Sequence, residues 1–575
     1  GPPACPCWRS GRRALQGRRP PCPPALASGP MAFIVPMAFI VPVLCLLRLA
    51  VAQQAGHNKP EVHPPMAFTT CTTASGCTSV ASTVTMDAQW RWTHDARKNQ
   101  YGNCIQGNSW DKTIAADGKT AAANCAIEGM DLQAYESTYG VSTIPGGVRL
   151  KFVNGQSVGS RLYMMEDDRT YKMFKLLNRE FTFDVDVSTL ECGLNGAVYF
   201  VEMEANGGMG TGNNSAGAKF GTGYCDAQCP HDLKFIAGEG NVHDWHLTKT
   251  GPIGHYGSCC SEMDIWEANF ASTAYTAHPC RTLGPKRCEG DTAENECGDT
   301  PPSCKCCSDD DVLTSCPCCG RYKGLCDKDG CDYNSFRLGA EDFYGKGPSF
   351  TVDTTKKITI VTQFLTSDDT DTGDLVEIRR LYVQDGKIIK NSVASNLGAF
   401  KGDSITDELC AAQKEIFDNP DDFKPKGGLK AMGQSLGRGM VLVLSLWDDM
   451  LTKMNWLDSD TPADDPKHPN TEPGVKRGPC SPTAGDPNTL RTMHGNSFVD
   501  YTNVIVGEIG TTYGASAQQA KQVAASGALK PPAPSPSTPA VLPQTPAASG
   551  QQPQAGAGGA TAGAQLPAAG SSGAM

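Results

Sequence analysis

The clearest chemistry-bearing residues in this sequence lie within residues 262–267, EMDIWE, where three carboxylates interrupt an apolar run. Because burying unpaired carboxylates is very costly, Glu262, Asp264 and Glu267 must face a polar cleft or find partners. Two carboxyl groups roughly 5–5.5 Å apart can cleave a glycosidic bond with retention, since one attacks the anomeric carbon while the other protonates the leaving oxygen. A third carboxylate can orient the nucleophile and keep the charges unequal. A solvated acidic strand edge is the alternative interpretation.

The spacing of the three carboxylates poses a geometric problem. Side chains alternate along a β-strand, so Glu262 and Asp264 share a face, whereas Glu267 has the opposite parity. An extra residue in the strand would return Glu267 to the shared face, and β-bulges of this kind are common beside active sites. We therefore expect a β-bulge between Asp264 and Glu267.

Four tryptophans offer flat apolar faces against which sugar rings can stack. Trp90 and Trp92 lie two apart on a predicted strand, so both can face one groove. Trp447 ends a further predicted strand, and Trp456 follows nine residues later. Taken singly, each of these tryptophans is more often a core residue than a sugar-binding platform.

The elements that must position these residues are predicted to be β-strands. Residues 181–187 alternate strictly, with apolar side chains on one face, and residues 197–203 and 358–364 form further strands. Residues 440–446 are apolar on both faces, which is typical of a strand inside a sandwich. Long helical periodicity is scarce, so an all-β fold of two packed, mainly antiparallel sheets fits best.

The composition argues against a nucleic-acid-binding protein. The chain has 575 residues, a net charge of −11 and a pI of about 5.5, which disfavours nucleic acid and anionic membranes as partners. Its 26 cysteines predict disulfides formed in an oxidising compartment. An even number remains once four cysteines near the N-terminus are set aside, namely Cys5, Cys7, Cys22 and Cys45.

Four segments follow from the composition along the chain. Residues 1–30 are rich in Pro, Arg and Cys and are interpreted as translated upstream sequence. Residues 31–52 are apolar, end in AVA and predict a signal peptide, while their prolines and arginine disfavour the alternative of a membrane anchor. Residues 53–514 predict one globular domain, and the Ala-, Pro-, Gly- and Ser-rich residues 515–575 predict a disordered tail or linker. We therefore expect a secreted, extracellular protein.

Residues 259–269, CCSEMDIWEAN, closely resemble the signature of glycoside hydrolase family 7, the fungal-type cellobiohydrolases and endoglucanases. The resemblance covers roughly residues 53–514, and the further motifs that carry it are DAQWRWTH (87–94), CGLNGA (192–197), GTGYCDAQCP (221–230), YKGLCDKDGCD (322–332) and SLWDD (445–449). It implies a disulfide-rich, curved antiparallel β-jelly-roll sandwich whose long loops form a cleft or tunnel. It also implies retaining hydrolysis of β-1,4-glucan. We expect a monomer without cofactor or metal that binds cellulose or other β-1,4-glucan chains.

The resemblance also implies roles for individual residues. Glu262 corresponds to the nucleophile, Asp264 to its orienting partner, Glu267 to the general acid and base, and His278 to a histidine beside the scissile bond. The implied substrate-binding residues are Trp90, Trp92, Tyr199, Tyr224, Asp226, Gln228, Arg321, Asp329, Asp332, Trp447, Trp456 and Arg477. Core packing is the alternative for the two tyrosines. Solvated surface charge is the alternative for the product-side polar residues, Asp332 first among them.

The loop content of the sequence bears on the mode of cleavage. Family cellobiohydrolases carry a roofing loop that ends in an Arg-Tyr pair, and Arg321-Tyr322 stands in that place. This chain keeps the loop and lengthens it by a Cys-rich insertion, residues 292–319. The resemblance therefore favours a cellobiohydrolase, with an endo-β-1,4-glucanase as the first alternative. A non-catalytic polysaccharide-binding jelly-roll protein is the alternative from a different class.

The resemblance suggests how most of the cysteines pair. The implied disulfides are Cys71–Cys77, Cys104–Cys125, Cys192–Cys480, Cys225–Cys260, Cys229–Cys259, Cys280–Cys326, Cys288–Cys297 and Cys331–Cys410. Six cysteines are left in the insertion, namely Cys304, Cys306, Cys307, Cys316, Cys318 and Cys319. Three extra disulfides are expected for an exported chain, with a zinc cluster as the alternative. Asn213 begins a glycosylation sequon.

Overall fold

The computed structural model describes residues 53–98, 102–212, 214–289, 295–299, 320–463 and 465–514. Several predictions from the sequence concern residues outside these ranges: the upstream segment, the signal peptide, the C-terminal tail, Asn213 of the sequon and the six cysteines of the insertion. Among the described helices, none has the length and apolar character that a membrane crossing requires.

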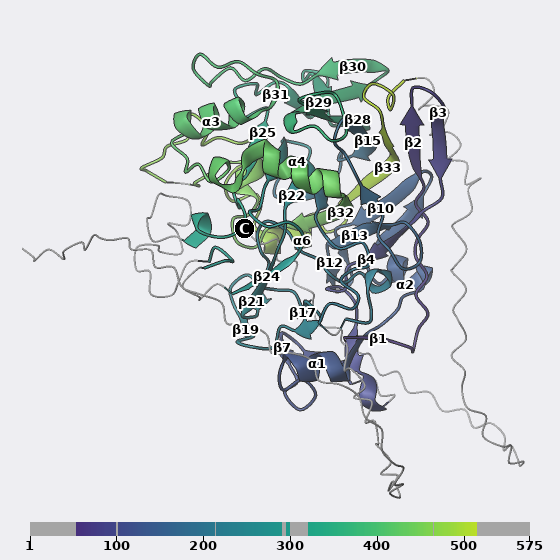
Figure 1. Ribbon diagram of the computed structural model, residues 1–575. Helices are drawn as coiled ribbons and strands as arrows, with labels where there is room; N and C mark the ends of the chain where they lie inside the picture. Colours follow the sequence, from purple (N-terminus) through teal and green to yellow (C-terminus); the bar gives the residue numbers. More distant parts are fainter. Residues whose placement is uncertain are drawn as a thin grey trace, which may run out of the picture. The chain divides into compact units, whose positions relative to one another are not determined.

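Two large β-sheets dominate the described structure (Figure 1). The larger sheet has the order β3 (Gly76–Val80), β2 (Phe68–Thr72), β33 (Phe498–Gly507), β15 (Arg179–Asp186), β28 (Ile358–Thr366), β29 (Leu375–Gln384) and β30 (Lys387–Lys390), with β9 (Val141–Ile144), β10 (Gly147–Lys151) and β31 (Ser404–Ile405) attached. The smaller sheet has the order β25 (Cys331–Asn334), β23 (Thr273–His278), β22 (Glu262–Ala268), β16 (Leu194–Val201), β32 (Met440–Asp448), β13 (Ser160–Met165) and β4 (Thr83–Met86), with β14 (Met173–Phe174) attached to β32. Apart from the parallel pair β2–β33, all neighbours in the two sheets are antiparallel.

Short elements in the connections complete the fold. The helices are α1 (Gly118–Asn124), α2 (Leu132–Ser137), α3 (Asp407–Ile416), α4 (Gly428–Arg438), α5 (Asn455–Asp458) and α6 (Pro487–Met493). The minor strands are β1 (Gln54–Ala55), β5 (Thr93–Asp95), β6 (Ile105–Gln106), β7 (Ser109–Trp110), β8 (Cys125–Ile127), β11 (Val153–Asn154), β12 (Ser157–Val158), β17 (Phe235–Ile236), β18 (Glu239–Gly240), β19 (His246–Leu247), β20 (Pro252–Ile253), β21 (Tyr256–Cys259), β24 (Lys286–Glu289), β26 (Tyr344–Gly345) and β27 (Val352–Asp353). Single-turn 3₁₀ segments are η1 (Ala96–Lys98), η2 (Ala218–Phe220), η3 (Gly320–Tyr322) and η4 (Lys424–Lys426).

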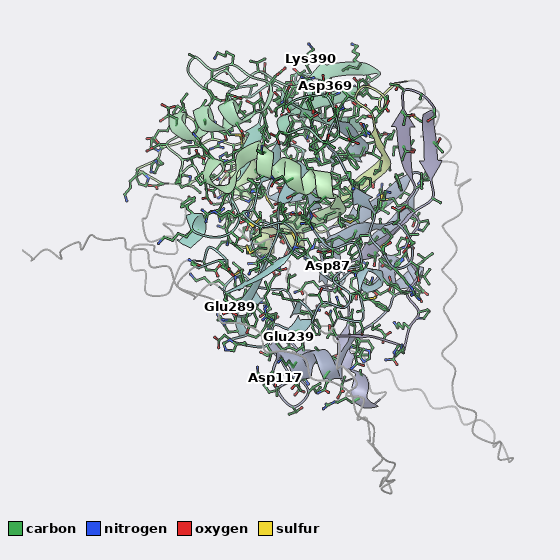
Figure 2. The ribbon with its side chains drawn as sticks, viewed as in Figure 1. Asp87, Asp117, Glu239, Glu289, Asp369 and Lys390 are labelled. Atoms are coloured by element: carbon green, nitrogen blue, oxygen red, sulfur yellow. A yellow bond between two sulfur atoms is a disulfide. The ribbon has the colours of Figure 1, made fainter. Side chains whose placement is uncertain are left out.

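The main hydrophobic core lies between the two sheets. Figure 2 shows the described side chains drawn on the ribbon. Phe181 and Phe183 of β15 enter it from the larger sheet, and Val198 and Phe200 of β16 enter it from the smaller one. The intervening residues of β16, which include Tyr199, point to the opposite face and join a second apolar cluster. Burial on both faces explains the near-continuous apolar character of the central strands. The prediction of an all-β jelly-roll sandwich is confirmed.

The predicted strands agree with β15, β16, β28 and β32, but one prediction is wrong. Trp90 lies in a turn between β4 and β5, and Trp92 follows that turn directly before β5, so neither is on a strand. The Asp87 side chain accepts a hydrogen bond from the Gln89 amide at 2.6 Å, and the Trp90 amide donates to the Asp87 carbonyl at 3.2 Å. Such Asp-anchored turns compete with strand pairing, and alternation of side chains cannot detect them.

All eight disulfides implied by the resemblance are present in the structure. They differ greatly in the length of chain that they close. Cys192–Cys480 joins residues 288 positions apart and ties the start of β16 to the C-terminal part of the domain, whereas Cys71–Cys77 closes only a hairpin with a separation of 6. A disulfide restricts the unfolded chain more when the loop that it closes is longer.

Removal of the long-range disulfide is therefore expected to destabilise the domain most. The double substitution Cys192→Ser/Cys480→Ser should lower the free energy of unfolding by about 3–5 kcal/mol, whereas Cys71→Ser/Cys77→Ser should lower it by about 2 kcal/mol or less. Denaturant-induced unfolding followed by tryptophan fluorescence measures both. Equal losses in the two variants would contradict the assigned difference.

Candidate active site

The strand β22 carries an irregularity at the position predicted from the sequence. Its pairing with β23 runs regularly from Glu262 to Asp264 and then shifts before Glu267. Against β16, Ile265 is the extra residue, because Val198 pairs with Trp266 and the next residue, Tyr199, pairs with Asp264. Ile265 and Trp266 therefore both enter the core in succession. The predicted β-bulge is confirmed.

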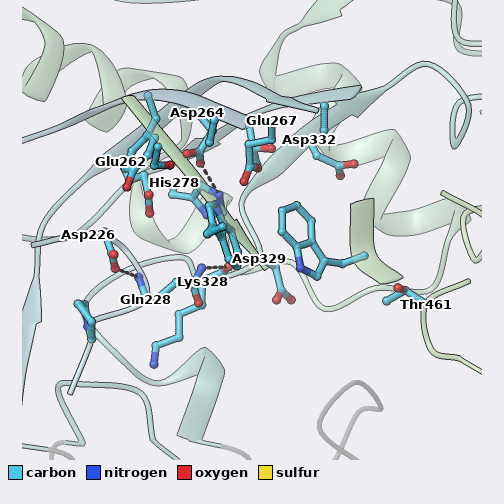
Figure 3. Close-up of a pocket in the computed structure, with 18 of the residues that line it drawn as sticks. Asp226, Gln228, Glu262, Asp264, Glu267, His278, Lys328, Asp329, Asp332 and Thr461 are labelled. Carbon is cyan, nitrogen blue, oxygen red and sulfur yellow. Dashed lines mark hydrogen bonds and ion pairs between the residues drawn. The ribbon is translucent and has the colours of Figure 1, made fainter. Parts of the chain in front are cut away.

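The bulge brings the three carboxylates together. Glu262, Asp264 and Glu267 line one pocket with a cavity volume of about 210 Å³, and Figure 3 shows their carboxyl groups turned toward the same space. The pocket continues into a second one of about 270 Å³, with which it shares Gln89, Trp90 and Asp232. All the site residues predicted from the sequence line the first pocket except Trp92, which lines the second.

Burial and mutual repulsion govern the ionisation of the carboxylates. Glu262 is 8%, Asp264 5% and Glu267 8% exposed. Burial, followed by the negative charge of Asp264, raises the pKa of both Glu262 and Glu267 well above the usual value. Hydrogen bonds act against this shift: the Ala227 amide donates to Glu262 Oε2 at 3.1 Å, and Asn195 Nδ2 donates to Glu267 Oε1 at 2.9 Å. The cluster therefore holds a proton more readily than isolated carboxylates would.

His278 supplies a positive charge beside the cluster. It lies opposite Glu262 in the register of β23, with Nε2 3.1 Å from Asp264 Oδ2. Its Nδ1 lies 2.9 Å from the Asp327 carbonyl oxygen, which can only accept a hydrogen bond. Burial lowers the pKa of His278, but the hydrogen bond to Asp264 and the charge of that residue outweigh it and raise the pKa to about 9. At neutral pH the imidazolium therefore balances the charge of Asp264.

The two predicted tyrosines form part of the pocket wall. The hydroxyl groups of Tyr199 and Tyr224 are hydrogen-bonded to each other at 3.0 Å, and both side chains also pack in the second apolar cluster. The Arg161 guanidinium stacks over the Tyr224 ring at 3.4 Å and pairs with Asp87 at 2.7 Å. Both tyrosines therefore line the pocket and pack in the apolar cluster at the same time.

Tryptophans supply the apolar surfaces of the pocket. Trp447, near the end of β32, and Trp456, in α5, have ring centroids 6.2 Å apart and ring planes only 28° from parallel. Trp456 Nε1 donates to Asp449 Oδ2 at 3.1 Å, which fixes the tilt of that indole. At the other end of the cleft, Trp92 Nε1 donates to Asn103 Oδ1 at 2.6 Å.

Polar residues gather on the Trp456 side of the pocket. Arg321 of η3 pairs with Asp329 at 2.6 Å, and Asp332 is bound by Arg337 and lies 3.7 Å from Arg477. Asp332 is thus paired and largely buried, which excludes the alternative of a solvated surface charge. Burial, and then the charge of Arg337, lowers the pKa of Arg477 to about 9.

Asp226 and Gln228 lie on the loop below Glu262. Burial raises the pKa of Asp226 to about 6, and its Oδ1 accepts a hydrogen bond from the Gln228 amide at 2.8 Å. Gln228 Nε2 donates to the Lys328 carbonyl at 2.7 Å, which links this loop to the segment that carries Asp329.

The sequence interpretation missed three residues that belong to the site. Arg161 and Lys328 line the pocket, and Asn195 donates to Glu267. A charged residue within the apolar strand β13 is a signal that could have identified Arg161. No comparable signal marks Asn195 or Lys328, because polar residues beside turns are common.

Among the described residues, the groups that could hold a metal ion lie away from this pocket. Most of the His, Cys, Asp and Glu groups close enough to bind an ion contain disulfide-bonded cysteines. The remaining group, His243, Asp244 and His255, brings its ligand atoms within 4.8 Å of one another, but none of the three lines either pocket.

A β-sandwich whose cleft combines buried, unequal carboxylates with tryptophan platforms defines a glycoside hydrolase. Comparison with known proteins identifies the group. Residues 55–513 match the family model described as glycosyl hydrolase family 7, and the chain belongs to this family.

Solved structures of the family resemble the chain closely. A GH7 family cellobiohydrolase from Daphnia pulex is 44% identical, with 80% of this chain and 100% of that chain covered and a TM-score of 0.74. A cellobiohydrolase from Melanocarpus albomyces complexed with cellotetraose is 38% identical, with 80% and 99% covered and a TM-score of 0.70. An endocellulase from Humicola insolens is 34% identical, with 80% and 100% covered and a TM-score of 0.65.

The pairing of His278 with Asp264 generates a prediction. In Asp264→Asn the charge that raises the histidine pKa is gone while burial remains, so the pKa of His278 should fall well below about 9. NMR titration of the His278 ring measures the change. Asp226→Asn is the matched control, because Asp226 lines the same pocket but does not contact His278. An unchanged pKa in Asp264→Asn would refute the assigned cause.

Proposed function

We propose that the protein is a secreted, retaining β-1,4-glucan hydrolase, and that it is a cellobiohydrolase releasing cellobiose from cellulose chains. The observation that carries the proposal is the bulge at Ile265, which places Glu262 and Glu267 in one pocket despite their odd sequence offset. A protein that only binds polysaccharide has no need for three repelling carboxylates at one point, since their burial is costly.

Glu262 is the nucleophile and Glu267 the general acid and base. Glu262 attacks the anomeric carbon and forms a glycosyl ester, while Glu267 gives its proton to the leaving glycosidic oxygen. Glu267 then takes a proton from a water molecule, whose oxygen attacks the same carbon and releases Glu262 as a carboxylate. Two successive inversions at this carbon give net retention.

The division of roles follows the family resemblance, and the electrostatics of the site are compatible with one protonated carboxyl group beside an ionised one. The acid must carry a proton near neutral pH, and burial together with the charge of Asp264 raises the pKa of Glu267 accordingly. Asp264 orients Glu262 from the same face of β22, and its pairing with the protonated His278 limits the repulsion that Glu262 experiences. The backbone amide of Ala227 favours the ionised form of Glu262.

An extended cleft fits a chain substrate better than a single sugar. Trp92 lines the second pocket, Trp90 lies where the two pockets meet, and Trp447 and Trp456 line the first pocket. Indole faces suit the apolar faces of pyranose rings, and the polar side chains between them can bind hydroxyl groups. In the relative from Melanocarpus albomyces, a complex with cellotetraose supports the assignment of a β-1,4-glucan.

The preference for cellobiohydrolase action rests on the roofing loop. Arg321 and Tyr322 of η3 line the pocket on the Trp456 side, in the place that the Arg-Tyr pair of family cellobiohydrolases occupies. The cellobiohydrolase from Daphnia pulex is also more similar to this chain than the Humicola insolens endocellulase is. An endo-β-1,4-glucanase is the second candidate, because endocellulases share the same fold and cover the same part of the chain. Eight disulfides support secretion.

Removal of the nucleophile tests the hydrolase assignment. Glu262→Gln should lower kcat on a chromogenic cellobioside by about three orders of magnitude or more, because the isosteric amide cannot attack the anomeric carbon. Binding to cellulose in a pull-down assay should persist. Glu136→Gln, at an exposed site in α2, is the matched control and should leave both properties unchanged. Near-normal turnover in Glu262→Gln would refute Glu262 as the nucleophile, whereas the absence of turnover in the wild type would indicate a non-catalytic carbohydrate binder.

The product profile tests the mode of cleavage. A cellobiohydrolase should release mainly cellobiose from crystalline cellulose and should reduce the viscosity of carboxymethyl-cellulose slowly. Chromatography of the soluble products and viscometry measure the two properties. A broad spread of product lengths together with rapid loss of viscosity would establish the endoglucanase instead.

A further inference from the structure

Arg380 occupies an unusual place in the larger sheet. It lies on β29, where the residues facing the core, Ile378 and Tyr382, alternate with half-exposed ones. Arg380 faces the core with them and is only 1% exposed. Burying a charge is costly unless it is paired, and a position of this kind is ordinarily filled by an apolar side chain.

The surroundings of Arg380 do not supply a counter-ion. Within the described residues, no carboxylate forms an ion pair with it, and its Nε and Nη1 are buried without a hydrogen-bond partner. Aromatic rings surround the guanidinium instead, with centroids 4.4 Å away for Tyr275, 5.8 Å for Tyr382 and 5.9 Å for Trp266. Cation–π contacts recover part of the lost solvation but do not by themselves explain a charge at this depth.

One polar contact crosses from Arg380 to the other sheet. Its Nη2 donates a hydrogen bond to the backbone carbonyl of Ile265. Ile265 is the extra residue of the β22 bulge and has no partner on β16 in the register. A buried carbonyl at such an irregularity needs a donor from elsewhere, since leaving it unpaired is costly. The contact of this buried cation with the smaller sheet therefore lies at the bulge that brings the carboxylates together, while Tyr382, two residues along β29, is its other polar neighbour.

We propose that Arg380 is a positioning residue for the reaction, which holds the Ile265 carbonyl and thereby fixes the bulge that sets Glu267 beside Glu262 and Asp264. The inference rests on the proposed function, because it assigns importance to the geometry of those carboxylates. Arg380 does not line either pocket, so it acts through β22 and not on the substrate.

A purely structural role for Arg380 predicts a different outcome from a positioning role. Arg380 has no ion pair within the described residues, so its replacement by an apolar side chain of similar volume removes a costly buried charge and leaves no ionic partner uncompensated. In Arg380→Met the fold should therefore persist, while the bulge loses its donor and can relax toward regular alternation. Relaxation in that direction carries Glu267 away from Asp264. Arg380→Met should consequently leave the stability unchanged or raise it, while it lowers kcat.

Kinetics of Arg380→Met and Arg380→Lys on a chromogenic cellobioside test the proposal. We expect kcat of Arg380→Met to fall about 10- to 100-fold, because small misplacements of catalytic groups have effects of this size. KM should stay within about twofold of the wild-type value, since the substrate-binding residues are untouched. Tm should be unchanged or higher. Arg380→Lys, which keeps a donor, should recover part of kcat.

The matched control is Arg379→Met. Arg379 is the neighbouring arginine on β29 and is partly exposed, because side chains alternate along the strand and it faces away from the core. It pairs with Glu377 at 2.9 Å. Its kinetics should equal those of the wild type. A kcat of Arg380→Met within about twofold of the control would overturn the proposal. If Arg380→Met does not fold, Arg380→Lys decides: a folded Lys variant with a partly lowered kcat and a shifted pH profile supports the positioning role, whereas a folded Lys variant with a lower Tm but with wild-type kcat and pH profile overturns it.

The pH profile distinguishes the two roles, because a purely structural role for Arg380 would leave the profile unchanged. Burial, and then the charge of Asp264, raises the pKa of Glu267, which must be protonated to act as the acid. If Glu267 moves away from Asp264, its pKa falls and the alkaline limb of kcat/KM shifts to lower pH in Arg380→Met. An unshifted limb would count against the proposal. Failure of the hydrolase assignment itself is distinguishable, since the wild-type protein would then show no turnover of the cellobioside.

Discussion

Three carboxylates and one imidazole share a pocket in which each side chain is less than a tenth exposed, and their electrostatic coupling is the constraint that the rest of the site must satisfy. Isolated carboxylates would not remain there in a defined ionisation state. His278 balances Asp264, while donors from Asn195 and Ala227 bind the other two carboxylates. The result is a set of chemically identical groups with unequal environments, which allows one to attack while another delivers a proton.

The two sheets contribute to this arrangement in different ways. The smaller sheet supplies the reactive face, because β22, β23, β16 and β32 place carboxylates, histidine, amide and indole on one side. The larger sheet never reaches the pocket, but its inner face packs against the back of β22. A rigid, close-packed interior therefore lies directly behind the residues whose separation matters most.

The β-bulge could be predicted from the sequence alone, because the odd offset between Asp264 and Glu267 leaves few other ways to bring both side chains to one face of the strand. The disulfide pairs followed from the family resemblance. The turn that carries Trp90 was not predictable, since the Asp87 side chain that anchors it gives the same alternation as a strand. Arg380 was equally hidden: it adjoins Arg379, and a pattern of two consecutive arginines does not reveal which one faces the interior.

The pairing of Trp447 with Trp456 limits how a sugar chain can move. Two van der Waals contacts require about 7–8 Å between flat surfaces that enclose a pyranose ring, which is more than the 6.2 Å between these centroids. A glucosyl unit consequently cannot be sandwiched between the two indoles and meets them one after the other. The two indoles therefore offer separate, neighbouring contact surfaces and do not clamp a single ring between them.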